Sequence, residues 1–98
     1  MLRIERSANG QVVFTLSGRM QTEDIEQFRQ LLVVEAPGRT VRFDLRYVTL
    51  VNQDAVTFLA HCEANGIELG NCPLYIRNWI DQEKRRNDRR RRRKKHTK

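Results

Sequence analysis

The chain has 98 residues, which is one domain's worth, and a unit of this size buries only about 60 to 65% of its extended surface, so mechanisms that need several domains are excluded. Charge is unevenly divided: residues 1–83 carry eight Lys and Arg against eleven Asp and Glu, a net of −3, whereas residues 84–98 carry eleven against one, a net of +10. A mildly acidic body with a basic extension is typical of a folded module with an electrostatic appendage, not of a fold built around nucleic acid.

The first predicted elements are two strands joined by a tight turn. Leu2 and Ile4 alternate with charged residues, and Asn9-Gly10 marks the turn. Residues 11–17 (QVVFTLS) are rich in β-branched and aromatic side chains. Together these features predict a β-hairpin.

A helix and a strand are predicted next. Thr22 can cap a helix that runs to about Glu35, because apolar residues recur there at the three-and-four spacing of one buried stripe. Pro37-Gly38 then stops the helix. Residues 40–45 (TVRFDL) place Val, Phe and Leu on one side, as expected of a strand.

The second half of the body repeats the helix-and-strand pattern. Asn52 is a plausible N-cap for a second helix with a broad apolar surface, which ends at Asn65-Gly66. Residues 67–69 form a short strand, and Pro73 suits the start of a third helix. The order β-β-α-β-α-β-α predicts an α/β fold with a small mixed four-stranded sheet, partly parallel, and helices packed against it.

The body and the basic tail are predicted to be separate units, a domain over residues 1–83 and a tail over residues 84–98. The tail has no apolar residue to bury, so we expect it to be disordered or a frayed extension of the third helix. The tail has three candidate partners: nucleic acid, an anionic membrane surface and an acidic protein. It has no aromatic residue for base stacking, so a nucleic-acid contact would not depend on base sequence. The candidate anion-binding residues are Arg89, Arg90, Arg91, Arg92, Arg93, Lys94 and Lys95.

Catalytic and metal-binding patterns are not found in the sequence. Cys62 and Cys72 lack a zinc-ligand spacing, and adjacent His61 and Cys62 point about 100° apart on a helix, which makes them poor catalytic partners. Cys62 is interpreted as a small core residue. We therefore expect no enzyme activity, cofactor or metal, and the absence of a signal-peptide pattern predicts a cytoplasmic protein with reduced thiols.

Two stretches of the chain resemble the STAS family, the sulfate transporter and anti-sigma-factor antagonist domains. They are LSGRMQTEDIEQFRQLL (residues 16–32) and VRFDLRYVTLVNQDAVTFL (residues 41–59), and the resemblance covers roughly residues 2–80. It implies a STAS-like fold and a non-catalytic role in protein–protein interaction. The expected setting is bacterial regulation as an anti-sigma-factor antagonist, or a small subunit of a membrane-associated transport complex.

The position of the family's regulatory serine differs here. Phosphorylated STAS members read Asp-Ser-Ser/Thr-Gly where the second helix opens, and a partner kinase modifies the first serine; this chain has Asn52-Gln53-Asp54-Ala55. Gln53 has no hydroxyl, so the serine switch is predicted not to operate at this place. Asp54 either imitates a phosphate at the helix start or only complements the helix dipole, and we favour the second interpretation.

The resemblance implies a contact surface around the start of the second helix, read by an anti-sigma kinase-like protein or a transporter component. An alternative is a nucleic-acid-associated adaptor that acts through the tail, and a third is small-ligand sensing near Asp44 and Asn52, although Asp44 alone is interpreted as structural. The oligomeric state stays open. The candidate partner-binding residues are Asn52, Gln53, Asp54, Ala55, Thr57 and His61.

Overall fold

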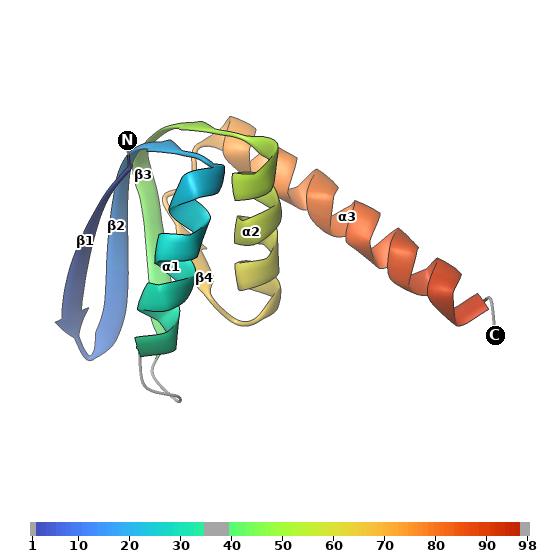
Figure 1. Ribbon diagram of the computed structural model, residues 1–98, viewed down its shortest axis with the longest axis horizontal. Helices are drawn as coiled ribbons and strands as arrows, with labels where there is room; N and C mark the ends of the chain where they lie inside the picture. Colours follow the sequence, from blue (N-terminus) through green and yellow to red (C-terminus); the bar gives the residue numbers. More distant parts are fainter. Residues whose placement is uncertain (1, 35–39, 97–98) are drawn as a thin grey trace.

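A computed structural model describes residues 2–34 and 40–96 of the chain. The predicted order of elements is confirmed (Figure 1). The elements are β1 (Leu2–Asn9), β2 (Gln11–Met20), α1 (Thr22–Val34), β3 (Val41–Val51), α2 (Gln53–Ala64), β4 (Glu68–Gly70) and α3 (Leu74–His96).

The four strands form one mixed sheet in the order β1-β2-β3-β4. β1 and β2 are antiparallel and are joined at Gly10, whose φ of +83° lies in the left-handed region that glycine adopts without strain. β2 pairs with β3 and β3 with β4 in parallel. The predicted mixed, partly parallel sheet is therefore confirmed.

The third strand is longer than the sequence predicts. The expected strand covered residues 40–45, whereas β3 extends to Val51 and β2 to Met20. The two strands stay paired through register shifts, with Gly18 opposite Val48 and Met20 opposite Val51. Such shifts interrupt the alternation of buried and exposed residues. After Leu45 the buried residues of β3 are Val48 and Val51, three residues apart, so the alternation that predicts a strand ends before the strand does.

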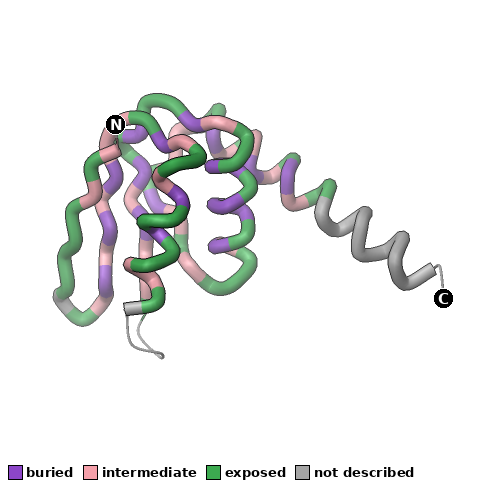
Figure 2. Tube along the Cα trace, in the orientation of Figure 1, coloured by how far each residue is buried: buried purple, intermediate pink, exposed green. Residues whose placement is uncertain are grey.

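One face of the sheet carries the core. Along β2, Val12, Phe14 and Leu16 are buried while their neighbours are only partly covered (Figure 2). α1 and α2 lie against this face. A chain of aromatic contacts joins the layers: the ring of Phe43 lies 6.0 Å from that of Phe14 and 5.4 Å from that of Phe28 in α1, which in turn lies 5.9 Å from Phe58 in α2.

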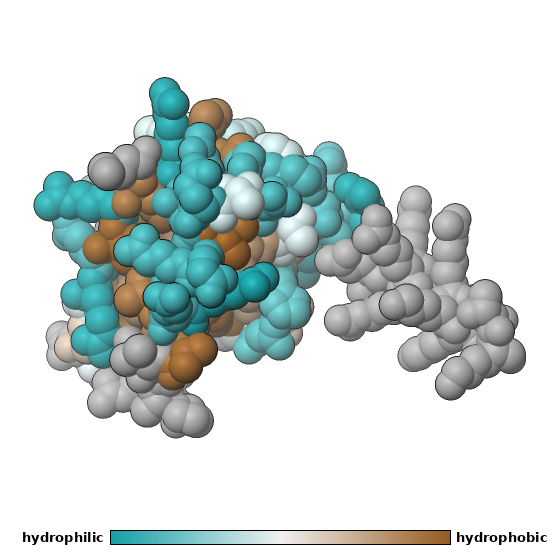
Figure 3. All heavy atoms as spheres, in the orientation of Figure 1, coloured by the Kyte–Doolittle hydropathy of each residue, from teal (hydrophilic) through white to brown (hydrophobic). Residues whose placement is uncertain are grey.

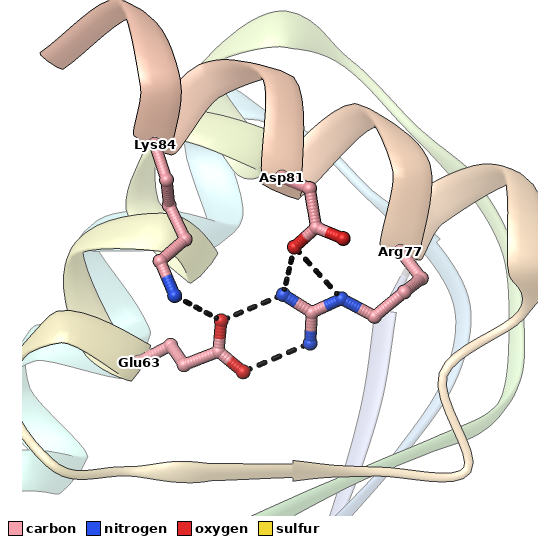
Figure 4. A network of polar contacts seen from close by, with 4 residues as sticks. All are labelled: Glu63, Arg77, Asp81 and Lys84. Atoms are coloured by element: carbon pink, nitrogen blue, oxygen red, sulfur yellow. Dashed lines mark hydrogen bonds and ion pairs between the residues drawn. The ribbon is translucent and has the colours of Figure 1, made fainter. Parts of the chain in front are cut away.

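α3 packs beside α2 through its first three turns. Ile76 and Ile80 are fully buried, and Glu83 continues the same stripe with 7% of its surface exposed. An ion-pair network fastens the two helices (Figure 4). Its members are Glu63, which accepts from Arg77 at 2.8 and 2.6 Å and from Lys84 at 2.9 Å, and Asp81, which accepts from Arg77 at 2.7 Å.

Beyond this network the helix continues to His96 and projects away from the body (Figure 1). The backbone of residues 84–96 is thus an extension of the third helix, one of the two forms that the sequence left open. The division into a domain and a functional tail stays a prediction. The expected helix end near Glu35 and the Pro37-Gly38 turn lie outside the described residues.

Candidate functional site

The candidate site lies where β3 gives way to α2. Asn52 is the N-cap of α2, as predicted: its backbone is extended, and its side-chain oxygen accepts from the amide of Ala55 at 3.0 Å. The amide of Asn52 donates to the carbonyl of Met20 at the end of β2. Because β2 and β3 run in parallel, their carboxyl ends meet at the same edge of the sheet, and both α1 and α2 start there.

A short chain of hydrogen bonds links the two helix starts. Thr22, the first residue of α1, donates its hydroxyl to the Asp54 carboxylate at 2.7 Å. The same hydroxyl accepts from the Asn52 amide group at 3.0 Å. Thr22 was predicted to cap α1, but the structure directs its side chain to α2. Asp54 in the first turn of α2 therefore complements the helix dipole and also holds the two helices together.

Two of the predicted contact residues face α3. Gln53 donates to one carboxylate oxygen of Glu83 at 2.9 Å, and the Thr57 hydroxyl donates to the other at 3.2 Å. Arg86 completes the contacts to Glu83 at 3.4 Å. A carboxylate this deeply buried needs such partners, so the start of α2 and the third turn of α3 form one polar cluster.

A groove of about 920 Å³ lies between α1 and α2. Its floor is apolar, with Ile25, Phe58 and Cys62 all less than 10% exposed. The space-filling view shows brown hydrophobic surface between the teal side chains that lie over α1 and α2 (Figure 3). The polar residues that line the groove are Thr22, Glu26, Arg29, Asp54, Thr57, His61 and Asn65.

Three of the predicted contact residues form a stripe along this groove. Asp54, Thr57 and His61 are spaced three and four residues apart on α2, all are exposed, and all line the groove. Gln53 is exposed too but lies on the side of α3. The assignment of Ala55 to the contact surface is corrected by the structure. Ala55 falls on the inner face of α2 together with Val56 and is fully buried in the core, so its side chain is not on the contact surface.

Cys62 lies in the floor of the groove and is a core residue, as predicted. Burial raises the pKa of its thiol to about 12, although the nearby Arg29 charge acts in the opposite direction. A thiol with such a pKa is protonated at neutral pH and is a poor nucleophile. The groove therefore offers apolar contact area and hydrogen-bonding groups, not an activated sulfur.

The structure does not bring together the two residues of the predicted small-ligand site. Asp44 lies seven residues before Val51, the last residue of β3, so it stands about 25 Å from Asn52 at ~3.3 Å per residue. Its carboxylate accepts from the amide of Arg46 at 3.0 Å and from Asn71 at 3.3 Å. Asp44 thus fixes the chain around it, through Arg46 and Asn71, and has no hydrogen bond to Asn52.

Within the described parts of the chain, no group of three or more His, Cys, Asp or Glu residues is arranged to hold a metal ion. Across those same parts, no helix combines the length and the apolar character needed to cross a membrane.

Comparison with solved structures supports the fold class. An uncharacterized protein of the DUF3478 family from Shewanella loihica PV-4, described as having a SpoIIAA-like fold, is similar with a TM-score of 0.51 and 18% identity, over 76% of this chain and 71% of that one. A structure described as Mglu is similar with a TM-score of 0.53 and 20% identity, over 69% of this chain but only 18% of that one. The chain thus has a SpoIIAA-like, STAS-like fold. No family model and no curated protein sequence matches it.

Proposed function

We propose that this chain is a non-catalytic protein-interaction domain whose contact surface is the α1–α2 groove together with the start of α2. The observation that carries the proposal is the groove itself, with an apolar floor and a polar rim at the edge of the sheet where both helices begin. Grooves between two helices suit an amphipathic helix of a partner, which buries its apolar face while its flanks contact the rim.

The charge on the rim favours a particular orientation of that partner. Asp54 and Glu26 make the end of the groove near the helix starts acidic, whereas Arg29 and His61 lie further along. A partner helix with a lysine or arginine at the corresponding end would pair with Asp54. The proposed partner is an anti-sigma-factor kinase-like protein or a transporter component, as the STAS resemblance implies, and binding is constitutive because Gln53 replaces the phosphorylatable serine.

The test is capture of the partner followed by a measured affinity. Tagged wild-type protein, Asp54→Lys and a matched control, Glu5→Lys, are used with native cell extract, and the recovered protein is then purified and titrated. Glu5 lies on β1, and its ion pair with Arg3 is highly exposed, so the control makes the same charge change with little effect on stability. We expect Asp54→Lys to weaken binding by about tenfold or more, roughly 1.4 kcal/mol, and Glu5→Lys to leave it unchanged.

A photo-crosslinking residue placed at His61 gives an independent measurement on a variant that keeps Asp54. Cross-links to the captured protein from position 61, but not from Ser7 on β1, support the groove as the contact. Equal affinities of the two charge variants, or cross-links from both positions, would place the interface elsewhere. Thermal unfolding of each variant confirms that the fold is intact.

A further inference from the structure

The projecting half of α3 is a basic helical arm, defined here as residues 84–96. After Ile80 the sequence contains no apolar residue, so the stripe that docks α3 on α2 ends at Glu83. The arm therefore leaves the body because it has nothing to bury, and the contacts of Glu63 and Glu83 fix its base. The candidate anion-binding residues 89–95 all lie on this arm.

The charge density of the arm is close to that of duplex nucleic acid. Residues 84–96 contain ten Lys and Arg and one Asp, a net of +9. At ~1.5 Å per residue they span about 20 Å, or one positive charge per roughly 2 Å. Duplex DNA carries one negative charge per about 1.7 Å of its axis, so the arm and a duplex have opposite charge at a similar spacing.

The arrangement of the basic residues favours a duplex over a flat anionic surface. The sequence of the arm is basic at ten of its thirteen positions and has no apolar residue, so it contains no apolar stripe. A membrane surface faces only one side of such a helix, and an interfacial helix also needs an apolar face, which the arm lacks. The major groove is about 12 Å wide, accepts a helix and has a phosphate row on each wall, so it can face basic residues on both sides.

From these observations we propose that the basic helical arm binds the phosphate backbone of duplex nucleic acid without reading its sequence. Arginine suits this role because its guanidinium pairs bidentately with phosphate. The docked base of α3 then places the body at a fixed distance from the duplex. This activity is independent of the groove, so it stands or fails separately from the proposed protein-interaction function.

The test measures binding of the full chain to a fluorescein-labelled DNA duplex of roughly 20 base pairs by anisotropy over a range of salt concentrations. The triple variant R90Q/R91Q/R92Q removes three charges from the arm. We expect its affinity at low salt to fall about tenfold or more, and the slope of log affinity against log salt to decrease by about three, close to one per lost phosphate contact. Two duplexes of unrelated sequence should bind equally.

The matched control, R3Q/R19Q/R46Q, removes the same three charges from exposed positions of the body. It should bind like the wild type, within about twofold. Equal losses in the two triple variants would show that only net charge matters and would overturn the proposal. So would binding to phosphatidylserine-containing phosphatidylcholine vesicles with no measurable binding to the duplex at the same salt concentration. Circular dichroism and thermal unfolding establish that both variants are folded.

Discussion

Glu63 is the residue whose charge we expect to contribute most to holding α3 in place. It accepts two hydrogen bonds from Arg77 and one from Lys84, and the Arg77 bonds are the main cause that lowers its pKa from 4.5 to about 2, against the opposing effect of burial. The same contact raises the pKa of Arg77. The ionised carboxylate is therefore favoured in the folded state over the unfolded one.

The size of this effect follows from linkage. Lowering the pKa from 4.5 to about 2 corresponds to at most roughly 3 kcal/mol, at ~1.4 kcal/mol for each tenfold change in acidity. Because 23% of the Glu63 side chain is exposed and Gln can still accept one bond from Arg77, we expect Glu63→Gln to lower the free energy of unfolding by about 1–2 kcal/mol at pH 7.

The pH dependence gives a sharper test than the value at pH 7. A carboxyl whose pKa is lowered in the folded state makes its full contribution to stability above pH 4.5, and this contribution is lost as the pH falls toward 2. The difference in the free energy of unfolding between wild type and Glu63→Gln, measured in urea, should therefore be constant above pH 4.5 and become smaller below it. The control Glu68→Gln breaks an exposed pair with Arg42 and should cost less than about 0.5 kcal/mol. If Glu63→Gln lowered the free energy of unfolding equally at pH 4.5 and near pH 2, the reasoning would be refuted.

Three further substitutions or reactions test the core, the cap and the thiols. Phe28→Ala should lower the free energy of unfolding by about 3–5 kcal/mol, because Phe28 is fully buried between the sheet and α2. The control Val33→Ala, at an 84% exposed position, should change it by less than about 0.5 kcal/mol. Equal effects of the two substitutions in thermal unfolding would contradict the packing. Asn52→Ala should cost about 0.5–2 kcal/mol through loss of the cap, measured in the same way, and an unchanged midpoint would mean that the cap contributes nothing. Brief maleimide labelling of the native protein should modify half-buried Cys72 before Cys62, and peptide mapping that finds Cys62 labelled as fast would show that the groove floor is open to reagent.

The parts of the fold that local chemistry encodes were predictable from the sequence. The Asn9-Gly10 turn, the Asn52 cap and the end of α2 near Gly66 each depend on residues within one turn of one another, and all three are present. The length of β3 was not predictable in the same way. Its last six residues stay in the sheet because β2 continues beside them, and a pairing between residues 30 or 31 positions apart leaves no local pattern.

The candidate site shows the same division. Helical spacing is enough to place Asp54, Thr57 and His61 on one stripe, but it does not say which side of α2 faces the core, and Ala55 was assigned to the wrong side. Glu83 was missed altogether. Its spacing after Ile76 and Ile80 is the signal that points to it, because it continues the buried stripe of α3 by one more turn.

The buried carboxylate of Glu83 limits how a partner can use the surface of α2. If a partner took the hydrogen bonds of Gln53 and Thr57 for itself, Glu83 would keep only the contact from Arg86 and would cost about 1–3 kcal/mol for each bond lost. Thr57 lines the α1–α2 groove as well as this cluster, so a partner in the groove leaves the cluster intact when it contacts Asp54 and His61 and the Thr57 hydroxyl keeps its bond to Glu83. The groove side is therefore the less costly side to bind, and we expect α3 to stay docked on α2 when a partner binds there.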